Sequence, residues 1–150
     1  MTLVFVDTNI VGYARDARDT VKQSIAAAWL EHLAQTRNGR LSWQVLTEFY
    51  QVATHSRKLG MPVDQARADV AALQAWNPSP LDIALFETAW RLSDRHGFSW
   101  WDALVVAAAR RCGCAILLSE DLQDGLEIDG VLRIVNPFAP DAPTPPTPPT

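Results

Sequence analysis

Two short segments without polar residues limit the folds open to this chain. Residues 3–6 and 115–118 are apolar throughout, so strands formed there have no face suited to water. Such strands are typical of a parallel sheet covered by helices on both faces. Residues 40–42 predict a brief strand, and residues 131–135 predict a last one.

Amphipathic segments alternate with these strands along the chain. Apolar residues recur at helical spacing over residues 20–36, 45–56, 62–76, 83–96 and 99–109. Strands that alternate with helices indicate an α/β fold, and we predict a three-layer α/β/α arrangement with a mainly parallel central sheet.

Length and composition favour one folded domain followed by a tail. The chain has 150 residues, of which 48% are hydrophobic and 20% are charged, as in globular domains. Seven of the ten prolines lie between Pro137 and Pro149, where no apolar periodicity is present. We therefore predict a domain over residues 1–138 and a disordered, Pro/Thr-rich tail over residues 139–150.

Neither export nor membrane insertion is expected. No apolar run approaches the roughly 20 residues that span a bilayer, and the N-terminus has no signal-like stretch. We expect a cytoplasmic protein in which Cys112 and Cys114 are buried or bystander thiols, because this spacing forms neither a disulfide framework nor a zinc site.

The charge balance bears on the class of ligand. With 17 acidic and 13 basic residues the net charge is −4, which argues against binding of nucleic acid by bulk charge alone. A divalent cation would be one way to bring a polyanion to this chain.

Four acidic residues are placed by the predicted topology at one edge of the sheet. Asp7 directly follows the first strand, and Asp121 follows residues 115–118. Glu48 and Asp102 lie in the first turns of two helices that begin at that edge. Ligands bind at the carboxyl ends of parallel strands, where the strand order reverses.

Each acid also has a purely structural interpretation. Asp7 could cap a helix, and Asp121 could belong to a turn. Ser99 and Asp102 have the spacing of a capping box, and Glu48 could lie on a solvated helix face. Convergence of all four on one edge favours a shared role.

Carboxylates gathered in this way repel one another and raise each other's pKa unless a cation is present. Oxygen ligands suit Mg²⁺ or Mn²⁺, and such sites hydrolyse phosphodiesters with a metal-activated water. Other chemistries lack their motifs, because the chain has no G-x-S-x-G, G-x-G-x-x-G or Walker A sequence and its three His are scattered. Whether one or two metal ions bind remains open.

Four short acidic motifs, in this order and spacing, carry a resemblance to a known family. They are Val4-Phe5-Val6-Asp7-Thr8-Asn9, Thr47-Glu48, Ser99-Trp100-Trp101-Asp102-Ala103 and Leu117-Leu118-Ser119-Glu120-Asp121-Leu122. Over about residues 3–136 the chain resembles the PIN domain, and its compact length resembles most the VapC toxins of bacterial VapBC toxin–antitoxin pairs.

The resemblance implies a Mg²⁺- or Mn²⁺-dependent endoribonuclease that acts as the toxin of such a pair. It also implies a homodimer and an inhibitory VapB-type antitoxin whose C-terminal segment crosses the active site. The residues it implies for metal binding and catalysis are Asp7, Glu48, Asp102 and Asp121.

The resemblance adds two supporting polar residues. Asn9 matches a polar position that could orient a ligand or water, and Ser119 stands where the family often has Thr. Glu120 and Asp124 are alternatives for the fourth acid, but Asp121 matches the motif's place two residues after Ser119.

Basic and aromatic residues near the predicted acid edge are candidates for RNA or partner contacts. Each basic pair, Arg57-Lys58 among them, more often belongs to a solvated face than to a phosphate contact, and Arg15, Arg18 and Arg40 are the preferred RNA contacts. Four of the six tryptophans flank that edge or its neighbouring helix and belong either to the core or to an interface: Trp29, Trp43, Trp100 and Trp101.

Two other functions remain open. One is a non-catalytic PIN-like module that binds protein or RNA, although such a module has no physical reason to keep mutually repelling carboxylates together. The other is a DNA- or RNA-processing nuclease of the same fold.

Overall fold

The computed structural model describes residues 2–146, and its centre is a five-stranded sheet with the order β2-β1-β3-β5-β4. The strands are β1 (Val4–Val6), β2 (Gly39–Arg40), β3 (Ile116–Leu118), β4 (Glu127–Ile128) and β5 (Leu132–Val135). All neighbouring strands are parallel except β4 and β5, which are antiparallel. The predicted α/β fold with a mainly parallel sheet is confirmed.

The register of the two central strands prepares the site. Val6 of β1 pairs with Leu118 of β3, and the backbone N–H of Asp7 donates to the Leu118 carbonyl at 3.1 Å. Asp7 and Ser119 therefore leave the sheet side by side. β2 lies on one side of β1 and β3 lies on the other. The ends of β1 and β3 are therefore also the point where the strand order reverses.

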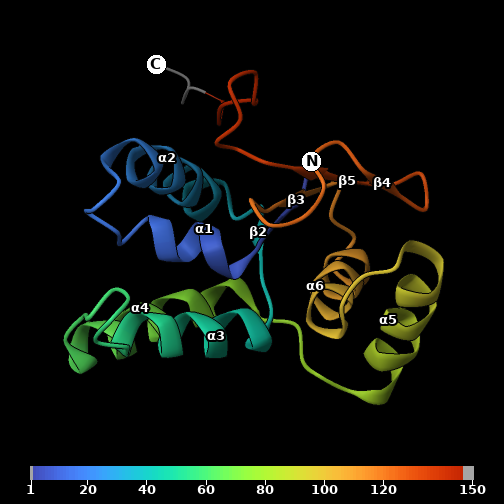
Figure 1. Ribbon diagram of the computed structural model, residues 1–150, viewed down its shortest axis with the longest axis horizontal. Coiled ribbons are helices and arrows are strands. Elements are labelled where there is room, and N and C mark those ends of the chain that lie inside the picture. The colour runs from blue at the N-terminus through green and yellow to red at the C-terminus, as the bar shows by residue number, and fades with distance from the viewer. Residues whose placement is uncertain (1, 147–150) are drawn as a thin grey trace.

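Helices flank the sheet, and along the chain they lie between β1 and β2 and between β2 and β3, whereas β3, β4 and β5 follow one another without a helix. The helices are α1 (Thr8–Tyr13), α2 (Thr20–Thr36), α3 (Trp43–Thr54), α4 (Val63–Leu73), the 3-10 helix η1 (Gln74–Trp76), α5 (Ile83–His96) and α6 (Trp100–Arg111). Figure 1 shows α1 to α4 gathered on the left of the molecule and α5 with α6 on the right. Among the described residues, none of these helices combines the length and apolarity that crossing a membrane requires.

The core is continuous from the sheet into the helices. Phe5, Leu117 and Ile134 are fully buried in the strands, and every residue from Ala103 to Ala109 of α6 is buried. The small alanine side chains let α6 pack closely against its neighbours. Because α6 is buried on all sides over these residues, the position of its first turn, which carries Asp102, is fixed by the core.

Several element boundaries differ from the sequence prediction. The helix predicted over residues 62–76 tightens into a 3-10 turn after Leu73, and the helix predicted over residues 45–56 begins two residues earlier, where Ser42 caps it. The sequence did not predict β4, because a two-residue strand carries no periodic signal.

The predicted tail is described only in part. Residues 139–146 contain neither helix nor strand, and the N–H of Ala142 donates to the carbonyl of Ala139 in a turn. Just before this segment, the Phe138 ring packs edge-on against Tyr13 at 5.1 Å. Residues 147–150 of the predicted tail lie outside the described residues. Disorder over residues 139–150 stays a prediction.

Gly39 gives a stability prediction, because a Cβ atom at this buried position of β2 would lie 2.5 Å from Cζ3 of Trp76. We expect Gly39→Ala to lower the free energy of unfolding by about 1–3 kcal/mol, the usual cost of overpacking. Gly12→Ala is the matched control, since a Cβ there meets no atom within 4 Å. Thermal or urea unfolding measures both, and equal stability of the two variants would contradict the packing argument.

Candidate active site

A cavity of about 840 Å³ opens at the carboxyl ends of β1 and β3, and all four sequence-predicted acids line it. Asp7 comes from the end of β1, Glu48 from α3, Asp102 from the first turn of α6, and Asp121 from the loop after β3. Four elements separated along the chain thus bring one carboxylate each to the same wall.

Asp7 lies deepest, with only 7% of its surface exposed. Its carboxylate accepts hydrogen bonds from the backbone N–H of Thr8 at 2.7 Å, the hydroxyl of Ser119 at 2.8 Å and the Asn9 amide at 3.3 Å. These donors favour the charged form, yet burial outweighs them and, with the charges of Glu48 and Asp121, raises the pKa of Asp7 to about 6.

Asn9 and Ser119 connect Asp7 with Asp121. The side-chain amide of Asn9 donates to an Asp121 carboxylate oxygen at 3.1 Å, and its oxygen accepts from the backbone N–H of Glu120 at 3.2 Å. The buried Ser119 hydroxyl donates to Asp7 and accepts from the backbone N–H of Asp121 at 3.2 Å. The two residues therefore hold the β1 and β3 carboxylates at a set separation.

Glu48 is held by donors from two helices. The hydroxyl of Thr8 donates to Oε2 of Glu48 at 2.8 Å, and the amide of Gln44 donates to Oε1 at 3.1 Å. The same Gln44 amide donates to the carbonyl oxygen of Trp101 at 3.2 Å. This bridge ties α3 to the first turn of α6, so the positions of Glu48 and Asp102 depend on each other.

The spacing of Ser99 and Asp102 fits either a capping box or a site residue at Asp102, and the hydrogen bonds distinguish the two. The Ser99 hydroxyl accepts a hydrogen bond from the backbone N–H of Asp102 at 3.2 Å, so Ser99 caps α6. Within residues 2–146 the Asp102 carboxylate makes no reciprocal bond to the Ser99 backbone, which a full capping box requires. The carboxylate faces the cavity instead.

The two alternative acids of the β3 loop have other partners. Glu120 accepts hydrogen bonds from Lys22 Nζ at 2.6 Å and from the Tyr13 hydroxyl at 3.0 Å. Asp124 accepts from the backbone N–H of Asn136 at 2.9 Å. Neither belongs to the cavity wall, whereas Asp121 does.

The structure brings only one of the three preferred RNA-contacting arginines to the cavity. Arg15 forms a bidentate ion pair with Asp69, with N–O distances of 2.6 and 2.8 Å, and lines a different, smaller cavity. Arg40 donates to the carbonyl oxygens of Arg37 and Gly39. Neither lines the acidic cavity: the Arg15 guanidinium pairs with Asp69 of α4, and the Arg40 guanidinium donates to carbonyls of its own segment.

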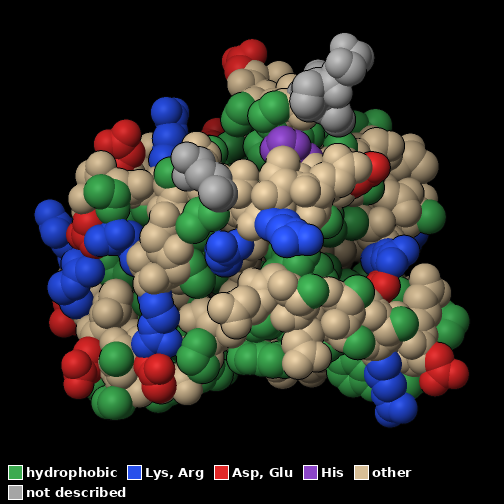
Figure 2. Space-filling view, turned by 180° about the vertical axis from the view of Figure 1, so that it is seen from behind, with side chains coloured by type: hydrophobic (Ala, Val, Ile, Leu, Met, Phe, Trp, Pro, Cys, Tyr) green, Lys and Arg blue, Asp and Glu red, His purple; other side chains and the backbone are tan. Residues whose placement is uncertain are grey.

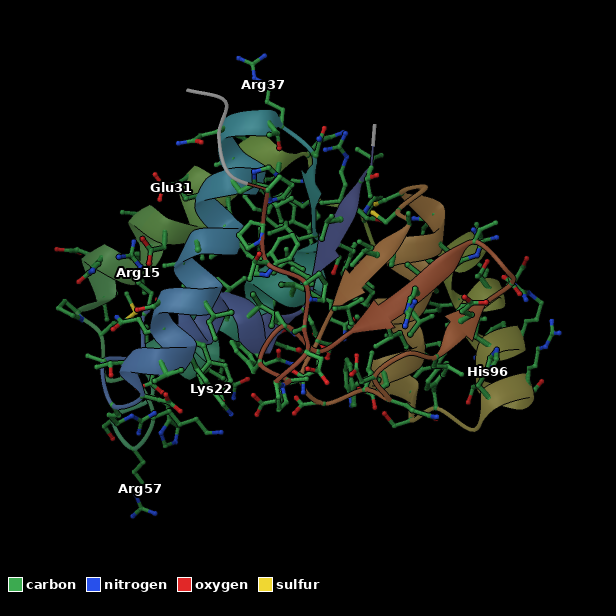
Figure 3. All side chains as sticks on the ribbon, turned by 90° about the horizontal axis from the view of Figure 1, so that it is seen from above. Arg15, Lys22, Glu31, Arg37, Arg57 and His96 are labelled. Atoms are coloured by element: carbon green, nitrogen blue, oxygen red, sulfur yellow. The ribbon has the colours of Figure 1, made fainter. Side chains whose placement is uncertain are left out.

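The basic residues at the cavity are Arg18, Arg57 and Lys58. Arg18 is paired with Asp16 at 2.8 Å, and Figure 3 shows Arg57 extended outward from the turn after α3. The sequence signal for Arg57 and Lys58 is their place at the end of the helix that carries Glu48. On the face seen in Figure 2, several Lys and Arg side chains lie near the left edge beside acidic ones, and others are spread over the face.

The donor set fits a hard divalent cation, because the cavity offers carboxylate oxygens and the buried Asp7 is surrounded by like charges. In the conformation described for residues 2–146, however, no three carboxyl, imidazole or thiol groups stand close enough to enclose an ion. Thr8 and Asn9 instead donate hydrogen bonds to the carboxylates. A bound cation would offset the same negative charge.

Comparisons with known proteins address the family and the fold. Residues 4–123 match the sequence profile of the PIN domain, whereas no curated protein matches the chain in sequence. The sarcin-ricin loop cleaving toxin VapC20 of Mycobacterium tuberculosis is similar in structure, with a TM-score of 0.56 and 22% identity over 76% of this chain and 86% of that one.

Two toxin–antitoxin structures are similar as well. A toxin-antitoxin complex from Klebsiella pneumoniae has a TM-score of 0.64 and 19% identity, covering 91% of this chain and 98% of that one. FitAB bound to an IR36 DNA fragment has a TM-score of 0.64 and 18% identity, covering 91% of this chain and 96% of that one.

Proposed function

Because the chain belongs to the PIN-domain family, we propose that it is a metal-dependent endoribonuclease that acts as the toxin of a toxin–antitoxin pair. The observation that carries this proposal is the convergence of four carboxylates from four separate elements on one cavity. Similarity in fold to an RNA-cleaving toxin and to a toxin–antitoxin complex supports it.

Asp7, Glu48, Asp102 and Asp121 are the residues that would hold Mg²⁺ or Mn²⁺. A bound cation of this kind increases the acidity of water and offsets the charge of a phosphodiester. Burial raises the pKa of Asp7 to about 6, so below that pH protons would compete with a cation for this carboxylate.

The surrounding polar residues position these carboxylates. Ser119 and Asn9 both donate to Oδ2 of Asp7, while the Thr8 backbone N–H donates to Oδ1. Thr8 and Gln44 each take one oxygen of Glu48. Residues that orient metal-binding side chains in this way commonly contribute 10- to 100-fold to metal affinity or activity.

The proposal extends to the partners and the compartment. We propose a VapB-type antitoxin as inhibitor, a homodimer as the assembled form, and the cytoplasm as the place of action. Toxin–antitoxin complexes of similar fold support the first of these. Exposed apolar side chains on α5, Ile83 at 62% and Trp90 at 49%, are consistent with a surface that a second chain covers.

A cleavage assay on total RNA tests the proposed function. Protein purified without any antitoxin is incubated with Mg²⁺ or Mn²⁺, and in parallel with EDTA. We expect cleavage only with the metal. If the folded protein neither cleaves RNA nor binds Mn²⁺ at millimolar concentration in calorimetry, the nuclease proposal is overturned in favour of a binding module.

Ser119→Ala tests the positioning of Asp7. Loss of the Ser119 hydroxyl removes a donor that favours the charged form of Asp7, so the pKa of Asp7 rises further and the cation is held less well. We expect cleavage and Mn²⁺ affinity to fall by about 10- to 100-fold. Ser79→Ala, at a buried serine outside the cavity, is the matched control. Values for Ser119→Ala within about twofold of the control would contradict the assigned role.

A further inference from the structure

Trp101 is a large aromatic side chain held open to solvent beside the acids. It is 62% exposed, lines the same cavity as the carboxylates, and directly precedes Asp102 in the first turn of α6. Isolated exposed apolar side chains are common on protein surfaces. What distinguishes Trp101 is its combination with a cavity of charged groups.

Three other tryptophans, Trp29, Trp90 and Trp100, have partners within the chain. The rings of Trp90 and Trp100 stack at 6.2 Å, and Phe86 packs edge-on against Trp100 at 5.2 Å. Trp29 is buried in the core. Within residues 2–146, Trp101 takes part in none of the aromatic pairs, so its ring is left for a ligand.

The backbone of Trp101 is fixed relative to the acids. Its carbonyl accepts from the Gln44 amide at 3.2 Å, and that amide also donates to Glu48 at 3.1 Å. Gln44 is 5% exposed, so this bridge is shielded from water. The indole therefore stands on a backbone whose place relative to Glu48 and Asp102 is set by the fold.

The same cavity offers exposed cations. Arg57 and Lys58 follow α3 and contribute to the wall, and no ion pair within residues 2–146 involves either of them. Cations that contact phosphates, combined with an aromatic surface on which a base stacks, are the features with which proteins bind single strands of nucleic acid.

We propose that Trp101 is a specificity-determining residue that stacks on an unpaired base next to the phosphate to be cleaved. The proposal rests on the ribonuclease function above. In a duplex both faces of an internal base are already stacked on neighbouring bases, so only an unpaired or flipped-out base can offer its face to this indole. Bases differ little in this respect, so this stacking contact is expected to accept any of the four bases.

The test compares Trp101→Ala, Trp101→Leu and Trp101→Phe with wild type in Mg²⁺. The substrates are a labelled single-stranded RNA copied from a cut site found in total RNA, and the same RNA annealed to its complement. Stacking on one base is worth about 1–3 kcal/mol, so we expect Ala and Leu to lower kcat/KM on the single strand by roughly 10- to 100-fold. Phe retains a ring, so we expect it to stay within about threefold of wild type, and no variant to change the low rate on the duplex.

Two controls separate stacking from a structural role. Trp43→Ala removes an exposed tryptophan, 40% accessible, that lies outside the cavity wall, and it is expected to leave kcat/KM unchanged. Mn²⁺ affinity from calorimetry and the thermal midpoint are expected to be the same for wild type and the Trp101 variants.

The outcomes distinguish this proposal from the function on which it rests. If wild type cleaves RNA with metal and Trp101→Ala does so equally well, stacking is overturned and the nuclease function stands. If Trp101→Leu is as active as Trp101→Phe, the position needs only an apolar surface, as a docked protein segment would, and stacking is overturned again. If wild type itself shows no metal-dependent cleavage, both proposals fall together.

Discussion

Asp7→Asn is expected to abolish RNA cleavage, with a fall in kcat/KM of about 10³-fold, while the fold is retained. Metal ions supply several kcal/mol of stabilisation to the charge of the transition state, and each 1.36 kcal/mol corresponds to a factor of ten in rate. Asp7 is the most buried of the four acids and lies between the charges of Glu48 and Asp121. A neutral amide there keeps the shape of the side chain but removes the charge that attracts a cation.

The measurement is cleavage of total RNA in Mg²⁺ or Mn²⁺ by wild type and the variant, with EDTA as the blank. Asp124→Asn is the matched control, because Asp124 lies on the same loop as Asp121 but outside the cavity, and an amide oxygen can still accept from Asn136. We expect the control to cleave like wild type. Cleavage by Asp7→Asn at the wild-type rate would show that the metal site is assigned to the wrong residues.

The raised pKa of Asp7 predicts that the metal-free protein loses stability as the pH rises through the range from about 4 to 6. Burial raises this pKa from 3.8 to about 6, so in that range the folded chain holds a proton that the unfolded chain has released. Protonation therefore favours the folded state, and that advantage is complete below the unfolded value and gone above the folded one. A shift of about two units corresponds to roughly 3 kcal/mol.

Urea unfolding in EDTA at pH 4 and pH 7 measures this effect when wild type is compared with Asp7→Asn. The difference in unfolding free energy, wild type minus variant, is expected to become more negative by about 3 kcal/mol on going to pH 7. Groups far from Asp7 cancel in that difference, including Asp129, whose pKa Arg91 and Arg110 lower to about 2. Parallel pH profiles for the two proteins would contradict the burial of an ionisable carboxyl at this position.

Stability and function are opposed at this site. The carboxylates that a nuclease needs for its cation repel one another without it, and the burial that places Asp7 at the end of β1 disfavours its charge. Mg²⁺ or Mn²⁺ is accordingly expected to stabilise wild type against unfolding, since a ligand that binds only the folded state shifts the equilibrium toward it.

Much of the fold and the placement of the acids could be predicted from the sequence, because each depends on neighbours along the chain. The strands were recognisable since residues 3–6 and 115–118 are apolar on both faces, and parallel strands bring their carboxyl ends to one edge. That rule is enough to place Asp7 and Asp121 near each other. In the structure, Val6 pairs with Leu118, so β1 and β3 end side by side.

Other features of the site depend on contacts between residues far apart in the sequence. Sequence periodicity treats Arg15 and Arg57 alike, yet Arg15 is taken up by Asp69 on α4, which lies 54 positions away. In the same way, Glu120 and Asp121 are adjacent in the sequence but differ in their surroundings. Lys22 and Tyr13 donate hydrogen bonds to Glu120, whereas Asp121 lines the cavity.

The sequence by itself thus determined the mainly parallel sheet and the sheet edge at which the four acids gather, because local periodicity and strand direction are sufficient for these. Only the tertiary structure decided which charges are already paired, how deeply Asp7 is buried and that Trp101 is left open beside Asp102. These properties follow from the side chains of other elements that surround a residue, and the spacing of residues along the chain does not record them.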